Sequence, residues 1–204
     1  MRERLLPPDP DDLNGTSLQD RDLLIRLTAY LDTLETRIRA GQGWCVFNAS
    51  RARSARIVNY LLVGLRGRMP PVSHSLMTWR DFALNAYVTE VALPHEEKAD
   101  PEPDPDSVRG RERGIARRVS REAYWRALNV DVFILVDVAP AHPHEVAFLL
   151  SILESRLRLR LPVILTTPHM PDALQAALAA IEGAELDAWP RLWRPIYETS
   201  LIAL

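Results

Sequence analysis

Residues 43–62, GWCVFNASRARSARIVNYLL, place a polar turn between an apolar strand and an amphipathic helix, an arrangement that many proteins use to bind phosphate. A phosphate-binding turn uses glycines so that backbone N–H groups can close around the phosphate oxygens. It also uses a lysine to reach the outer phosphates and a Ser or Thr hydroxyl to ligate Mg²⁺. The turn here, residues 48–55, contains neither glycine nor lysine. It is therefore either an ordinary strand-to-helix connection or a phosphate-binding loop that has lost its ligands.

Arginines gather in two parts of the sequence. Arg51, Arg53 and Arg56 begin the helix after the turn, where the helix dipole also favours anions. The second group lies in residues 109–128, where a tyrosine and a tryptophan could stack on bases while arginines bind the phosphate backbone. Its candidate nucleic-acid-binding residues are Arg109, Arg111, Arg113, Arg117, Arg118 and Arg121. The alternative is a solvated face, or one that pairs with the acidic run at 96–106 of the same chain.

Other residue patterns give no catalytic or metal-binding candidate. His142, His144 and His169 lie in loops after buried strands, but a metal site needs three or four ligands with supporting hydrogen bonds. Cys45 lies within an apolar run, and the sequence has no Gly-x-Ser-x-Gly elbow. We therefore predict no metal, no cofactor and no nucleophilic catalysis.

Alternating strand and helix patterns position the turn. The run VFILVDV is continuously apolar up to its acid, as expected of a central parallel strand that is covered on both faces. A capping box precedes a helix with apolar residues at helical spacing. The predicted helices are 20–39, 53–65, 79–91, 145–159 and 171–181, and the predicted strands are 45–48, 72–77, 132–138, 162–167 and 199–204. This alternation predicts an α/β protein, a three-layer sandwich with a mainly parallel central sheet.

The bulk properties are those of one globular domain. The 204 residues suffice for a single core. We expect a Pro- and Asp-rich arm at 1–16, one domain at 17–204, and a disordered acidic loop at 94–108. The net charge of −2 gives no overall attraction to nucleic acid or membrane. A single cysteine, no long apolar stretch and no signal peptide predict a cytoplasmic protein without a membrane partner.

The order of these elements resembles that of the AAA+ ATPases of the bacterial replicative-helicase-loader type and of the ATPase subunits that assist insertion-sequence transposases. In that family the strand–turn–helix is the Walker A motif, an apolar strand that ends in acids is Walker B, and a strand ending Thr-Ser/Thr-Asn is sensor 1. GWCVFNASRARSARIVNYLL, VFILVDV and PVILTTP occur here in the same order. The resemblance covers residues 23–204 and implies a P-loop NTPase (AAA+)-like fold without a separate lid domain.

The resemblance also implies which residues stand at the Walker A positions. Asn48, Arg51 and Arg53 stand where the family has glycines, Ser54 replaces the lysine, and Ala55 replaces the Ser or Thr. Side chains at the glycine positions would crowd a phosphate, and Ala55 cannot ligate a metal. Loss of the lysine removes a charge contact that in a desolvated site stabilises bound phosphate by several kcal/mol.

The Walker B and sensor 1 positions have changed as well. Asp137 stands at the metal-side acid, or alternatively caps the next turn, while Val138 replaces the second acid that polarises the attacking water. Thr166 and the sensor 1-like Thr167 remain, but Pro168 replaces the next polar residue and has neither an N–H nor a polar side chain. The three losses together indicate a pseudo-ATPase.

Arg156 matches the place where this family carries an arginine finger, which reaches into the nucleotide site of a neighbouring subunit. The alternative is that Arg156, with Arg158 and Arg160, is one of the basic residues that suit the dipole and the surface at a helix end.

We therefore expect a catalytically inactive AAA+-like domain that acts by binding. Its partner would be an active AAA+ ATPase, a helicase or transposase component, or a nucleic acid, and oligomers are compatible with this role. Two alternatives stay open. One is an active ATPase with Asp137 on the metal and Arg53 or Arg56 in place of the lysine. The other is a nucleic-acid-binding module that uses residues 109–126.

Overall fold

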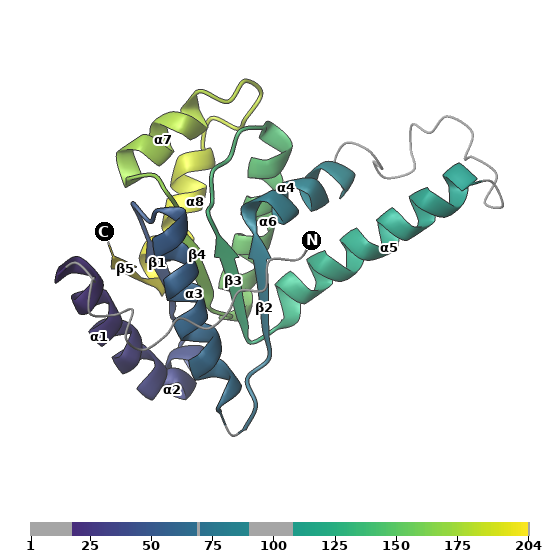
Figure 1. The fold of residues 1–204 in the computed structure, drawn as a ribbon. Helices are drawn as coiled ribbons and strands as arrows, with labels where there is room; N and C mark the ends of the chain where they lie inside the picture. The colour runs from purple at the N-terminus through teal and green to yellow at the C-terminus, as the bar shows by residue number, and fades with distance from the viewer. Residues whose placement is uncertain (1–17, 69, 90–107, 204) are drawn as a thin grey trace.

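The computed structural model describes residues 18–68, 70–89 and 108–203. Within them, five strands form one parallel sheet in the order β2-β3-β4-β1-β5 (Figure 1). The strands are β1 (Gly43–Val46), β2 (His74–Thr78), β3 (Val132–Val136), β4 (Val163–Thr166) and β5 (Ser200–Ala203). The predicted arm at 1–16 lies outside the described residues, and so does the predicted disordered loop at 94–108 except for Val108, which is the first residue of a helix.

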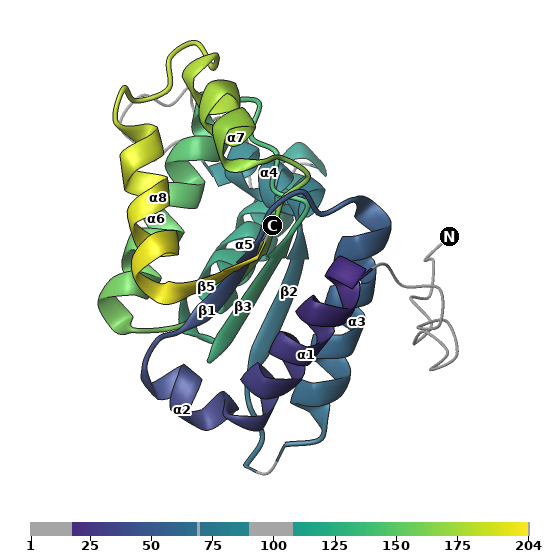
Figure 2. The same cartoon turned by 90° about the vertical axis from the view of Figure 1, so that its left-hand side faces the viewer.

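Helices cover both faces of the sheet (Figure 2). α1 and α3 pack on one face, and α4, α6, α7 and α8 pack on the other. Their bounds are α1 (Leu18–Asp32), α2 (Leu34–Arg39), α3 (Arg51–Arg66), α4 (Trp79–Tyr87), α5 (Val108–Asn129), α6 (Pro143–Leu159), α7 (Pro171–Ala179) and α8 (Ala188–Thr199). This arrangement confirms the predicted three-layer α/β sandwich. Among the described helices, none is both long and apolar enough to pass through a bilayer.

β3 contributes side chains to the hydrophobic cores on both faces of the sheet, as its apolar sequence predicts. Phe133 and Leu135 point into the core that is formed with α4, α6 and α8. Val132, Ile134 and Val136 point to the opposite face and into the core under α1 and α3. The alternation follows from the two-residue period of a strand, and all five side chains are buried.

The strand register brings the three predicted motifs to one edge of the sheet. β1 lies between β4 and β5, with Cys45 opposite both Leu165 and Ile202. β3 in turn pairs with β4, with Leu135 opposite Leu165. Because all the strands are parallel, the residues that follow β1, β3 and β4 leave the sheet at the same carboxyl edge, where open α/β folds bind their ligands.

The predicted helix over residues 20–39 is two helices, so that prediction is wrong in one detail. α1 ends at Asp32 and α2 begins at Leu34. Between them, the Thr33 hydroxyl donates a 2.8 Å hydrogen bond to the carbonyl oxygen of Ala29. A Thr side chain that bonds a carbonyl of the preceding turn tends to bend a helix at that point.

α8 was not predicted, because its sequence contains Pro190 and Pro195, and proline disfavours a helix. Packing outweighs that preference: Leu192 and Ile196 are buried in the core. Trp189 and Trp193 pack against the same core, as predicted.

Gly43 permits a close approach between β1 and β4. A Cβ built at this position would lie 1.9 Å from the carbonyl oxygen of Val163, which is far inside contact distance. We expect Gly43→Ala to lower the free energy of unfolding by about 3 kcal/mol, because the strands must move apart.

The control is Gly114→Ala in α5, where an added Cβ meets nothing within 4 Å. That change should leave stability unaltered or raise it by up to about 1 kcal/mol, since Ala favours helix over Gly. Urea unfolding followed by circular dichroism measures both variants. Equal stability of the two variants would contradict the close approach of β1 and β4.

Candidate functional site

The turn between β1 and α3, residues 47–50, has its backbone N–H groups engaged inside the protein. Three of them donate to carbonyl oxygens of distant segments: Phe47 to Ala203 at 2.9 Å, Asn48 to His169 at 3.1 Å and Ala49 to Thr167 at 2.9 Å. Asn48 has a φ of 50°, a left-handed conformation that Asn adopts more readily than most residues. A phosphate could accept hydrogen bonds from these groups only if the turn first gave up its own.

α3 begins within the segment that would form the phosphate-binding loop. Ser50 is its N-cap: the Ser50 hydroxyl accepts from the N–H of Arg53 at 3.3 Å, and the Ser50 carbonyl accepts from the N–H of Ser54 at 2.8 Å. Arg51, Arg53, Ser54 and Ala55 therefore lie in the first turns of a helix. Only residues 47–50 lie between the end of β1 and the start of α3.

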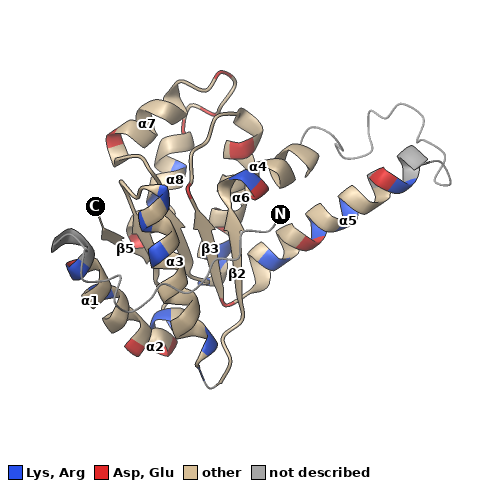
Figure 3. Ribbon diagram, viewed as in Figure 1, with Lys and Arg blue, Asp and Glu red and all other residues tan. Residues whose placement is uncertain are grey.

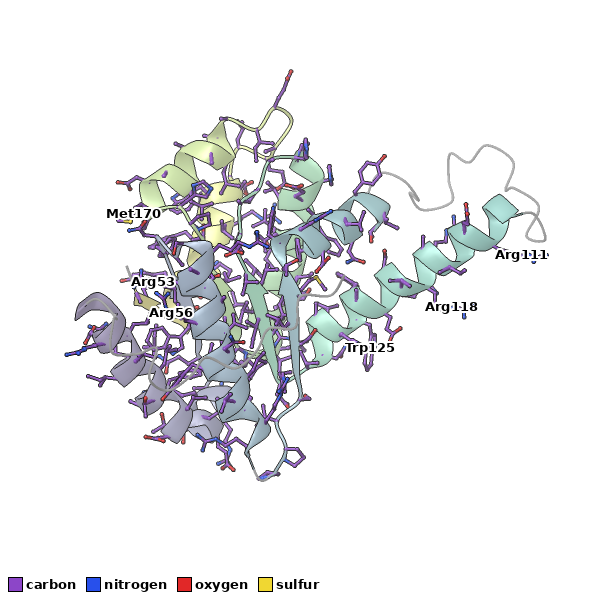
Figure 4. The ribbon with its side chains drawn as sticks, in the orientation of Figure 1. Arg53, Arg56, Arg111, Arg118, Trp125 and Met170 are labelled. Carbon is purple, nitrogen blue, oxygen red and sulfur yellow. The ribbon has the colours of Figure 1, made fainter. Side chains whose placement is uncertain are left out.

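Arg53 lies back over this turn. Its side chain is 9% exposed, and its Nη1 lies 3.4 Å from the carbonyl oxygen of Asn48. Arg53 and Arg56 both extend from the amino-terminal part of α3 (Figure 4), and Arg51 and Arg56 are exposed. The guanidinium of Arg53 thus lies at the predicted phosphate position, where it contacts the turn itself.

A buried polar cluster joins the three predicted motifs. The Ser54 hydroxyl donates to Thr166 Oγ1 at 3.0 Å, and the same oxygen accepts from the N–H of Asp137 at 3.0 Å. Thr167 Oγ1 donates to the carbonyl oxygen of Val138 at 2.7 Å. The Walker A-, Walker B- and sensor 1-like positions are therefore neighbours. The polar groups named here form hydrogen bonds with one another and with the main chain instead of facing an open cavity.

Asp137 is the strained member of this cluster. It has a φ of 61°, and its Oδ1 is buried without a hydrogen-bond partner among the described residues. The next residue, Val138, is buried in the core, and Pro168 is exposed. Asp137 is thus an acid just after β3, but Val138, which follows it, and Pro168, which ends the sensor 1-like segment, have no polar side-chain atom that could orient a water molecule.

Among the described residues, His142, His144, His169 and Cys45 do not form a reactive site. Within the described part of the chain, no three His, Cys, Asp or Glu side chains are grouped so that they could hold a metal ion. His142 and His144 stack face to face with ring centroids 5.4 Å apart, so their nitrogens do not converge. Burial raises the pKa of the Cys45 thiol far above its ordinary value, which disfavours the reactive thiolate.

A cavity of about 460 Å³ lies at the opposite, amino edge of the sheet. Asp32, Glu35, Arg39, Arg68 and Asp131 are among the residues that line it, and no residue of the β1–α3 turn does so. This opening is therefore separate from the predicted nucleotide position.

Arg156 is fully buried, which contradicts the prediction of an arginine finger at this position. Burial lowers the pKa of its guanidinium to about 10, an effect that Asp131 opposes, so Arg156 stays charged at neutral pH. Its guanidinium donates to four main-chain oxygens: Ala127 at 2.7 Å, Val130 at 3.0 Å, Asp131 at 3.2 Å and Pro162 at 2.9 Å. Arg156 therefore ties the end of α5 to the starts of β3 and β4 and cannot reach another subunit.

The second arginine cluster lies along α5, which carries basic residues over its whole length (Figure 3). Arg111, Arg118 and Arg121 are exposed there, and Arg117 is half-buried. Of Arg109 and Arg113 only the helical backbone is described. Nucleic-acid binding by this helix stays a prediction.

Asp137 provides a test of whether this edge still serves a metal. We expect Asp137→Asn to raise the free energy of unfolding by about 1 kcal/mol, because a buried carboxylate oxygen without a partner loses its charge. Asn also tolerates the left-handed backbone. The exposed Asp172→Asn, in the first turn of α7, is the control and should lose a few tenths of a kcal/mol of dipole stabilisation. Stabilisation of the wild type by Mg²⁺ that disappears in Asp137→Asn would instead support a metal role.

Arg156 provides a test of how much its buried hydrogen bonds contribute to stability. Arg156→Leu should lower the free energy of unfolding by about 3–5 kcal/mol, because it leaves buried carbonyl oxygens without donors. Arg158→Leu, two residues away and exposed, should change stability by less than about 0.5 kcal/mol. Chemical denaturation measures both. A stable Arg156→Leu protein would show that these hydrogen bonds do not hold the fold.

Several solved structures are similar to this chain, whereas sequence comparisons find no match. No protein-family model matches the sequence, and no curated protein matches it. The DnaC helicase loader matches with a TM-score of 0.62 and 13% identity, over 99% of this chain and 98% of that one. DnaI matches with a TM-score of 0.60 and 15% identity, over 100% and 90%.

The replication initiator DnaA, in a structure bound to AMPPCP and single-stranded DNA, matches with a TM-score of 0.58 and 11% identity. The match covers 96% of this chain but 50% of DnaA, and 48% of a further DNA replication initiation factor is covered. This chain thus spans about half the length of those initiators. At such identities the likeness concerns the fold alone: this chain has a fold similar to those of the DnaC helicase loader and of DnaI.

Proposed function

We propose that this chain is a catalytically inactive AAA+-like domain that acts as a binding or adaptor protein. Its partner would be a protein such as an active AAA+ ATPase, a helicase or a transposase component. One observation carries the proposal: the turn where the fold would hold a triphosphate is closed by hydrogen bonds to the rest of the chain.

The closed turn disfavours nucleotide in two ways. Freeing the N–H groups of Phe47, Asn48 and Ala49 breaks three backbone hydrogen bonds, each with a net contribution of about 1 kcal/mol. The sum, about 3 kcal/mol, corresponds to roughly a hundredfold loss of affinity. In addition, Ser54 stands in place of the lysine and donates its hydrogen bond to Thr166.

Hydrolysis has a separate obstacle. Phosphoryl transfer to water needs a residue that positions the attacking water. Val138 and Pro168 have no polar side-chain atom, and the hydroxyl of Thr167 is bonded to the main chain. Even a weakly bound nucleotide would therefore persist without turnover.

The similar structures support a binding role. Two of them are named as a helicase loader and as DnaI, and a third as a replication initiator bound to single-stranded DNA. Proteins with this fold thus include ones named for their work on other replication components. A domain that keeps the fold without the nucleotide site can still present its surfaces to a partner.

Calorimetric titration of the full chain with ATP and Mg²⁺ tests this proposal. We expect no saturable heat up to about 1 mM ATP, which corresponds to a binding free energy weaker than about −4 kcal/mol. Phosphate release should equal that of buffer, for the wild type and for Asp137→Ala alike. Micromolar binding with turnover that Asp137→Ala abolishes would establish the active-ATPase alternative instead. Loss of that binding in Arg53→Ala or Arg56→Ala would identify the residue that replaces the lysine.

A further inference from the structure

The amino-terminal half of α5 stands clear of the sheet and its covering helices (Figure 1). In the other half, Ala127 is buried and the Tyr124 ring lies 5.4 Å from that of Phe148. Three large apolar side chains on α5 are exposed: Ile115 is 62% exposed, Val119 56% and Trp125 63%. Apolar groups of this size at helical spacing on a free helix are typical of a surface that a partner covers.

Five of the exposed positions of α5 lie along one side of the helix. Positions 111, 115, 118, 122 and 125 are separated alternately by four and three residues, which places them on one face of a helix. Arg111, Arg118 and Trp125 indeed lie along the same side of α5 (Figure 4). At 1.5 Å per residue, these positions span about 21 Å, the length of four helical turns. We call these five positions the α5 seam.

The seam is basic as well as apolar. α5 contains seven arginines and two glutamates. Among the described residues, Arg111 and Arg118 have no ion-pair partner, whereas Glu122 is paired with Arg126 one turn further along α5. The seam therefore presents two cations, at 111 and 118, on either side of the apolar side chain of Ile115.

We propose that the α5 seam docks an amphipathic helix of a partner protein, with acidic side chains opposite Arg111 and Arg118 and apolar ones opposite Ile115 and Trp125. This rests on the proposed function, because it gives the inactive domain its attachment surface. The four-three spacing is that of a helix packed against another helix, and Trp and Arg are the residues that contribute most at protein interfaces.

Charge complementarity selects this occupant over two others. A second copy of the chain would place one arginine-rich α5 against another, and like charges repel. A nucleic acid would satisfy the arginines and stack on Trp125, but the branched side chain of Ile115 neither bonds phosphates nor stacks on bases. An acidic amphipathic helix uses both arginines and both apolar side chains of the seam.

The test uses the full chain and labelled synthetic helical peptides of about 21 residues. Two peptides carry the sequence in opposite orders, one for parallel and one for antiparallel docking against α5. The peptide carries Glu opposite Arg111 and Arg118, Leu opposite Ile115 and Trp125, and Lys opposite Glu122. Fluorescence anisotropy at about 0.15 M salt should show saturable binding, since surface attraction is already screened there. Arg111→Glu with Arg118→Glu should weaken binding at least about tenfold. A peptide with Lys in place of the two Glu should then recover it.

Matched variants separate the seam from general surface effects. Ile115→Ser should weaken binding several-fold, whereas Val63→Ser, at an equally exposed position on α3, should not. Arg66→Glu with Arg80→Glu, two exposed arginines outside α5, should leave binding unchanged. A scrambled peptide of the same composition should bind at least about tenfold more weakly.

Several outcomes would overturn the proposal. One is equal binding of the scrambled peptide, and another is no binding of any peptide. A third is tight, salt-sensitive binding of single-stranded or duplex oligonucleotides that the Arg111 and Arg118 changes abolish, which would assign the seam to nucleic acid. A dimer in sedimentation that the same changes dissociate would assign it to a second copy. The nucleotide titration tests a separate claim. If ATP bound and the peptide still docked on the α5 seam, only the proposed catalytic inactivity would be wrong.

Discussion

The hydrogen bonds that close the β1–α3 turn are the constraint on which the rest of the site depends. The N–H groups of Asn48 and Ala49 are used by the segment after β4, and that of Phe47 by the end of β5. In a fold that holds a triphosphate, such groups must face an open space. Here they join three parallel strands at the edge where a ligand would enter. The same interactions that stabilise the edge of the sheet engage the N–H groups that a bound phosphate would need.

The remaining polar groups at this edge are arranged consistently with that closure. Ser54 and Thr166 bond each other, and Thr167 bonds the main chain. Only Asp137 keeps an oxygen without a partner among the described residues. α5 differs from this edge of the sheet, because apolar and basic side chains on α5 face solvent.

Sequence patterns predicted the fold well and the site only in part. The apolar run at 132–138 and the strand–helix alternation were enough for the three-layer sandwich, and parallel register brought Asp137 next to Thr166. The closure of the turn could not be predicted, because its acceptors lie more than a hundred residues away. Arg156 was misassigned for a different reason: its acceptors are carbonyl oxygens at the ends of other elements, which only the folded chain brings together. α8 forms through core packing, which outweighs its two prolines.

The exchange rates of single backbone amides test the central claim most directly. Hydrogen–deuterium exchange measured by NMR, with and without ATP and Mg²⁺, reports on the N–H groups of Asn48 and Ala49. The closed turn predicts slow exchange at both amides in the protein alone, and no change when nucleotide is added. Fast exchange that becomes slow upon addition of ATP would show an open nest that a phosphate fills, and would contradict the account.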